Sequence, residues 1–177
     1  MNHEDHINLI SPAGLKTAGV WADLGAGIGA FTLALREVLG PQAEIFAVDK
    51  DRNSLDELQR RHHKRFGGVG GLHFLRADFL DPLELPPLNG VLMANSLHFY
   101  HDKVSILERV RGFLQPGGLL VLVEYNVDKG NPWVPFPLSF QTFVELASQA
   151  GFQTPRLVGK HPSSFLREFF AARAETT

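Results

Sequence analysis

The residues best suited to chemistry lie in positions 20–39, the stretch VWADLGAGIGAFTLALREVL. Gly25, Gly27 and Gly29 occupy every second position shortly after Asp23. Because glycine has no Cβ, a loop with this spacing lets the backbone approach a bound ligand closely. The helix expected after the loop would direct free N–H groups toward the same ligand. The stretch therefore predicts a loop that holds a cofactor.

Asp23 bears on the kind of cofactor. Its carboxylate would oppose the phosphates that a helix N-terminus attracts in a dinucleotide site. A cofactor that carries an ammonium and a sulfonium, such as S-adenosylmethionine (SAM), would be favoured beside this charge. The same loop also fits the relaxed dinucleotide pattern, since Gly25-x-Gly27-x-x-Ala30 matches G-x-G-x-x-A. The loop alone leaves both cofactors open.

Composition indicates one ordinary globular domain. The chain has 177 residues, of which 44% are apolar and 20% charged, and its net charge is −2. This balance does not point to nucleic acid or an anionic membrane as a partner, and we interpret the basic run 60–65 as a solvated helix end. The absence of cysteine excludes disulfides, thiolate metal sites and a cysteine nucleophile. With neither a signal peptide nor a membrane span expected, we predict a cytoplasmic location.

Hydrophobic runs and turn residues predict the elements that position the loop. Buried strands are expected at residues 20–24, 44–48, 72–76, 88–94 and 119–123. Helices are expected after Gly29, from a capping box at Ser54 to about Arg65, after Asp102, and over residues 139–150. A turn is expected over residues 115–118. We expect residues 1–19 to form an N-terminal arm with about one helical turn, and residues 20–177 to form the cofactor-binding domain.

The alternation of strands and helices predicts an α/β fold. We expect a doubly wound, mostly parallel sheet of about seven strands with helices on both faces. The last two β-compatible runs, residues 153–159 and 165–173, are separated by a short turn. Because a parallel crossover needs a dozen residues or more, this pair should be antiparallel. A dinucleotide fold would repeat a second mononucleotide unit instead.

Three polar residues follow the expected strands. Asp49 ends the second strand, 20 positions after Gly29, where such folds place an acid for ribose hydroxyls. Asp78 follows the third strand and Asn95 the fourth. Ligands of open α/β sheets bind at the carboxyl ends of the strands, so these residues should meet at one edge. Taken singly, Asp49 could also be a helix cap, Asp78 a turn residue, and Asn95 an acceptor for loop backbone.

The pattern D-x-G-x-G-x-G on Asp23 and the glycines, together with these strand ends, resembles class I SAM-dependent methyltransferases. The closest resemblance is to small-molecule methyltransferases of the ubiquinone/menaquinone-biosynthesis type. It covers residues 20–123 well and the remaining residues loosely. The resemblance implies a sheet whose seventh strand runs antiparallel between strands five and six. It also implies SAM as cofactor and S-adenosylhomocysteine (SAH) as product.

The same resemblance implies roles for residues at the strand ends. Asp49 would hold the ribose hydroxyls, and Lys50 would border the adenine. Asp78 would accept a hydrogen bond from the adenine amino group beside the Phe79 backbone, and Asn95 with Ser96 would lie near the methionine end. The predicted cofactor site comprises Asp23, Gly25, Ala26, Gly27, Gly29, Asp49, Lys50, Asp78, Phe79, Asn95 and Ser96.

Methyl transfer from a sulfonium is an in-line displacement, so the protein mainly aligns the reactants. A general base is needed only when the acceptor must first lose a proton, as a phenol would. His98, Tyr100 and His101 are the candidate bases, because they follow the fourth strand on the expected acceptor side. A structural role for His98 is the alternative. No metal site is expected.

The acceptor is expected to be a small molecule. Enzymes that methylate exocyclic amines of nucleobases or glutamine end strand four in an N-P-P-Y-type motif, whereas here Asn95 precedes Ser96-Leu97-His98. Trp133 and Phe136 could form a lid or an acceptor wall, or could be packing or dimer contacts, and a homodimer could complete the site. Two other functions stay open: an NAD(P)-dependent oxidoreductase and a non-catalytic SAM-binding module.

Overall fold

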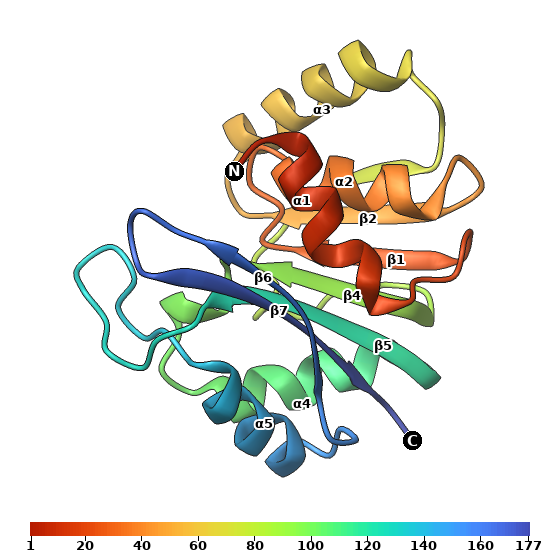
Figure 1. The fold of residues 1–177 in the computed structure, drawn as a ribbon. Helices are drawn as coiled ribbons and strands as arrows, with labels where there is room; N and C mark the ends of the chain where they lie inside the picture. Colours follow the sequence, from red (N-terminus) through yellow and green to blue (C-terminus); the bar gives the residue numbers. More distant parts are fainter.

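The computed structural model describes residues 1–177, which form one seven-stranded sheet with helices on both faces (Figure 1). The elements in chain order are α1 (His3–Ile10), η1 (Ser11–Ala13), β1 (Val20–Leu24), α2 (Ala30–Leu39), β2 (Glu44–Asp49), α3 (Arg52–Phe66), β3 (Leu72–Arg76), β4 (Leu88–Ala94), η2 (Leu97–Phe99), α4 (Lys103–Phe113), β5 (Leu114–Tyr125), α5 (Phe140–Gln149), β6 (Arg156–Pro162) and β7 (Glu168–Glu175).

The strand order is β3-β2-β1-β4-β5-β7-β6. Strands β1 to β5 are parallel to one another, and β7 runs antiparallel between β5 and β6. The predicted fold class is therefore confirmed, including the antiparallel strand between the fifth and sixth. The parallel strands place their carboxyl ends along one edge of the sheet, and the loops that follow β1, β2, β3 and β4 meet there.

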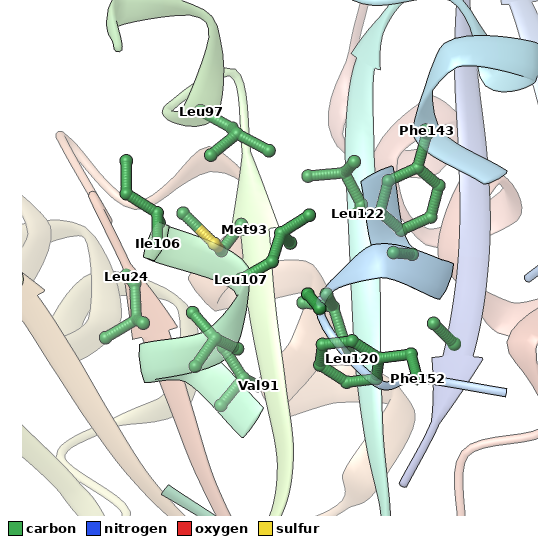
Figure 2. Packing of buried hydrophobic residues seen from close by; sticks show 14 of the residues in the cluster. Leu24, Val91, Met93, Leu97, Ile106, Leu107, Leu120, Leu122, Phe143 and Phe152 are labelled. Carbon is green, nitrogen blue, oxygen red and sulfur yellow. The ribbon is translucent and has the colours of Figure 1, made fainter. Parts of the chain in front are cut away.

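Two apolar layers cover the sheet. Figure 1 shows α1, α2 and α3 on one face and α4 with α5 on the other. On the second face, Leu24 and Met93 from the strands pack against Leu107 of α4, and Leu122 lies near Phe143 of α5 (Figure 2). Each side chain of this size contributes roughly 1.5–3 kcal/mol when fully buried. This packing fixes the strand ends that carry the site.

The N-terminal segment differs from the expected arm with a single helical turn. Residues 3–10 form α1, an eight-residue helix. Its start is stabilised by a reciprocal cap, in which Asn2 Oδ1 accepts from Asp5 N at 2.9 Å and Asp5 Oδ2 accepts from Asn2 N at 2.7 Å. Leu9 and Ile10 at its end are buried among α2 and the sheet. The segment is therefore packed structure, and a domain boundary at residue 19 stays a proposal.

Two local expectations were wrong. Helix α3 begins at Arg52 because Asp51 is its N-cap and accepts from Asn53 N at 3.1 Å. Ser54 donates to Asp51 Oδ2 at 2.8 Å rather than capping the helix itself. Strand β5 begins at Leu114 and includes the expected turn, with a register shift opposite residues 88–90.

The alternation of strands and helices has one gap, since residues 77–87 between β3 and β4 contain no helix. Strand β3 is the edge strand and is only partly buried, so its burial was overestimated. The strands β6 and β7 begin three residues later than the runs expected from the sequence.

Candidate ligand-binding site

A cavity of about 600 Å³ lies at the carboxyl edge of the sheet, where β1 to β4 end. Ten of the eleven residues predicted for a cofactor site line it, the exception being Gly29. The structure therefore brings together residues that are up to 73 positions apart in the sequence, from Asp23 to Ser96. Their individual roles stay predictions.

The glycine loop is attached to β2 and lies close to β4. The N–H groups of Gly25 and Ala26 donate to Val48 O at 2.9 and 3.0 Å. Gly25 has a φ of +81°, and a Cβ added there would lie 2.5 Å from the Ser96 Cβ. Only glycine fits this backbone at this distance. Gly29 instead faces α3, where an added Cβ would overlap the Leu58 side chain, so glycine at this position allows α3 to pack closely.

Asp23 is almost fully buried beneath the loop. Its Oδ2 accepts from Thr32 Oγ1 at 2.6 Å. Burial raises the pKa of Asp23 to about 7, while the hydrogen bond from Thr32 opposes the shift and the charge of Asp49 adds to it. A cation in the cavity would favour the ionised form of this carboxyl group.

Two further acids lie at the β2 and β3 ends of the cavity. Asp49 Oδ2 accepts from Gly27 N at 2.7 Å, and its Oδ1 accepts from Asp51 N at 2.9 Å. Asp78 Oδ1 accepts from Leu80 N at 3.0 Å. Lys50 Nζ is 3.9 Å from Asp78 Oδ2, but the lysine side chain is 72% exposed and the pair is weak. Each acid thus stabilises a loop and also faces the cavity.

Two polar side chains follow β4, one with a hydrogen-bond partner and one without. Ser96 Oγ donates to Leu24 O at 2.8 Å, which ties the β4 end to β1. Asn95 has a φ of +55°, and its Oδ1 is buried without a hydrogen-bond partner. Because a buried acceptor without a donor is costly, Asn95 Oδ1 is a candidate ligand contact.

Of the three candidate bases, only Tyr100 lines the cavity. Its ring packs edge-on against Phe79 with centroids 5.4 Å apart, and burial raises its pKa, with the charges of Asp78 and Asp49 adding to the effect. A raised pKa makes the phenol a hydrogen-bond donor rather than a proton acceptor near neutral pH. His101 is exposed and contacts Phe136 edge-on, outside the cavity.

His98 forms a buried pair with Glu124. Its Nδ1 lies 2.7 Å from Glu124 Oε2, and the two side chains are 4% and 0% exposed. Glu124 Oε1 also accepts from the backbone N–H groups of Leu97 and His98 at 2.9 and 3.2 Å. The pair joins the loop after β4 to the end of β5, beside the cavity rather than in its lining.

Several lining residues were not predicted from the sequence. They include His6 of α1, Phe31 in the first turn of α2, and Phe99 of η2, which is 56% exposed. His6 gave no signal in the sequence, because α1 reaches this edge only through tertiary packing, whereas Phe31 and Phe99 lie in segments that were expected at the site. Trp133 and Phe136 are 72% and 41% exposed and do not line the cavity.

The structure contains no group of three His, Cys, Asp or Glu side chains placed to hold a metal ion. None of its helices combines the length and apolarity that crossing a bilayer requires.

A family model described as a methyltransferase domain matches residues 22–120. The chain is 32% identical over 105 residues to the carboxy-S-adenosyl-L-methionine synthase of Photorhabdus laumondii, an alignment that covers 58% of this chain and 41% of that protein. It is 26% identical over 119 residues to the ubiquinone/menaquinone biosynthesis C-methyltransferase of Pasteurella multocida, covering 66% of this chain and 44% of that protein. The chain thus spans less than half the length of these curated relatives.

Among solved structures, the fold is similar to that of a SAM-dependent methyltransferase from Aquifex aeolicus. The TM-score is 0.72 at 19% identity, and the match covers 98% of this chain and 93% of that one. At this identity the likeness concerns the fold.

Proposed function

The chain belongs to the methyltransferase domain family, and we propose that it transfers a methyl group from SAM to a small-molecule acceptor. The observation that carries the proposal is the cavity at the carboxyl edge, where the glycine loop, Asp49, Asp78 and Asn95 meet. The antiparallel β7 and the family membership both argue against the NAD(P)-dependent oxidoreductase alternative.

The residues present fit SAM. The cavity volume is within the range of about 300–1,000 Å³ that small-molecule sites occupy. A Cβ added at Gly27 would meet nothing within 4 Å, so the loop leaves open space there for a ligand. Asn95 Oδ1 is a buried acceptor without a donor, and Asp23 is a buried carboxyl group with a raised pKa. An ammonium group would donate to Asn95 Oδ1, and a cation would stabilise the ionised form of Asp23.

The roles implied by the sequence can be given to specific atoms. Asp49 would hold the ribose hydroxyls with the carboxylate that already orders Gly27 N. Asp78 and the Phe79 backbone would contact the adenine, with Lys50 at its border. Asn95 would contact the methionine end, where Ser96 supports the loop through its bond to Leu24 O.

Bound SAM supplies a methyl group that is already activated as part of a sulfonium. The protein's part is to orient the acceptor and exclude water, which can be worth ~7–11 kcal/mol. Tyr100 lines the cavity and would hold an acceptor there by hydrogen bonding. If the acceptor must lose a proton, His98 and His101 would reach it only through a movement of the segment after β4. The cytoplasmic location and a homodimer stay predictions.

Calorimetry with four ligands tests the cofactor. We expect SAM and SAH to bind at least about tenfold more tightly than NAD or NADP, because Asp23 beside the glycine loop opposes a pyrophosphate in this cavity. Ligand carried through purification is first removed and identified by mass spectrometry. Binding of NAD without binding of SAM would contradict the proposal. SAM binding with no turnover across an acceptor screen would favour the non-catalytic module.

Replacing Asp49 by alanine tests the ribose contact. We expect SAM affinity to fall about five- to a hundredfold, since removing the acceptor leaves bound hydroxyls unpaired at ~1–3 kcal/mol. Asp51→Ala is the matched control, because Asp51 caps α3 and does not line the cavity. An Asp49→Ala protein that binds SAM as tightly as the Asp51→Ala protein would leave Asp49 with only its loop-stabilising role.

A further inference from the structure

Helix α1 contributes a histidine to the cavity. His6 is the one lining residue that comes from the segment before β1. Its ring packs edge-on against Phe31 with centroids 4.6 Å apart, and its Nδ1 is buried without a hydrogen-bond partner. A second unpartnered buried atom, Asn95 Oδ1, belongs to the lining of the same cavity. Buried polar atoms without partners are uncommon, and two in one cavity point to a shared ligand.

The sheet order places His6 at one end of the cavity. Asp49 and Asp78 lie at the ends of β2 and β3, on the β3 side of the sheet. Helix α1 packs instead against α2, β6 and β7, on the other side of β1. His6 therefore lies at the end of the cavity opposite Asp78. With ribose at Asp49 and adenine at Asp78, this opposite end takes the sulfonium and the amino-acid group.

The groups around His6 favour its neutral form. Burial lowers the pKa of His6, and the positive charges of the N-terminal amine, His3 and His161 lower it further, while Asp5 opposes them. His161 comes from β6, with its Nε2 3.6 Å from Asp5 Oδ1. The facing part of α2 contributes the uncharged Phe31, and Glu37 farther along α2 is held by His3 and Arg65. The acids that line the cavity are Asp23, Asp49 and Asp78.

We propose that His6 is a specificity-determining residue of the cofactor site. Its neutral imidazole adjoins the sulfonium end of SAM, and its protonated form disfavours SAM relative to SAH. The inference rests on the proposed function, because it takes the SAM orientation from it. SAM carries the sulfonium charge and SAH does not. A proton on His6 therefore adds a repulsion that only SAM experiences.

Binding of SAM and protonation of His6 must affect each other to the same extent. If the proton on His6 weakens SAM binding by a given factor, bound SAM must lower the proton affinity of His6 by the same factor. Bound SAH must lower the proton affinity of His6 by a smaller factor. A histidine that only packs against Phe31 would titrate alike in both complexes.

The first experiment measures SAM and SAH affinity by calorimetry at pH 7.5 and pH 5.0. We expect the preference for SAM over SAH to decrease about two- to fivefold at the lower pH, because a lowered pKa reduces the fraction of His6 that is protonated at pH 5.0. Asp23 also gains a proton in this range and contributes to the change. The His6→Gln protein keeps Asp23 but has no charge to gain at position 6, so its decrease should be smaller than the wild type's.

His63→Gln is the control, since His63 is an exposed histidine of α3 that does not line the cavity. It should retain the wild-type pH dependence. The second experiment follows the His6 ring by NMR across pH in the free protein and in the two complexes. Equal pH dependence in wild type and His6→Gln, or equal His6 titration in the SAM and SAH complexes, would overturn the inference. Failure of both ligands to bind at pH 7.5 would overturn the proposed function instead.

Discussion

Gly25→Ala is expected to lower SAM affinity more than about a hundredfold, which corresponds to ~2.7 kcal/mol. At a φ of +81° an L-residue is strained by ~1–2 kcal/mol. The added Cβ would also lie 2.5 Å from the Ser96 Cβ, and Ser96 is held by its bond to Leu24 O. Because Gly25 and Ser96 both line the cavity, any relief of this contact moves the cavity wall. Calorimetry with SAM measures the loss.

Gly67→Ala is the control for backbone strain. Gly67 has a φ of +65° at the end of α3, and a Cβ there meets nothing within 4 Å. We expect it to reduce stability modestly and to leave SAM affinity unchanged. The double variant Gly25→Ala/Ser96→Gly removes the clashing partner and should regain part of the affinity. Normal SAM binding by a folded Gly25→Ala protein would show that the loop does not form the cavity wall.

His98→Ala is expected to lower the free energy of unfolding by about 3 kcal/mol. The substitution leaves Glu124 Oε2 buried and unpaired, while Oε1 keeps its two backbone donors. Leaving a buried acceptor without its partner typically costs ~1–3 kcal/mol, and the space left by the buried imidazole places this case at the upper end. Urea unfolding measures the change, and SAM affinity should be nearly intact because His98 does not line the cavity.

Glu124→Gln is the matched variant, since the amide oxygen can still accept from the Leu97 and His98 N–H groups. We expect a stability loss of about 1 kcal/mol, similar to that of one hydrogen bond. Once an acceptor is known, turnover separates the two roles of His98. A ~10²–10⁴-fold loss of turnover in a His98→Ala protein of near-normal stability would make His98 the base and contradict the structural role.

The cofactor side of the site could be predicted because its signals are local. Asp23 and the glycine loop occupy consecutive positions, and Asp49 and Asp78 directly follow strands whose apolar runs are plain in the sequence. Parallel strands then bring their carboxyl ends together without further information. The same reasoning placed the antiparallel β7, because the short turn before it excludes a parallel crossover.

The other features of the site depend on contacts between residues that are distant in the sequence. Glu124 reaches His98 across 26 positions, and only the structure shows that this pair is buried. Asn2 and Asp5 cap the start of α1, but eight residues make a marginal helix on their own, and packing of Leu9 and Ile10 against α2 and the sheet stabilises it. His6 therefore could not be placed in the cavity from its neighbours in the sequence.

The position of β7 has a consequence for the order in which the molecule assembles. Strand β6 precedes β7 in the chain, yet it reaches the sheet only through β7, which pairs with β5. During synthesis β6 therefore joins the sheet only after β7 has been made. Helix α1 packs on β6 beside Gly159, so it lacks this contact until β7 is in place. The wall that carries His6 is thus completed only after β7 has paired with β5, although α1 can already pack on α2.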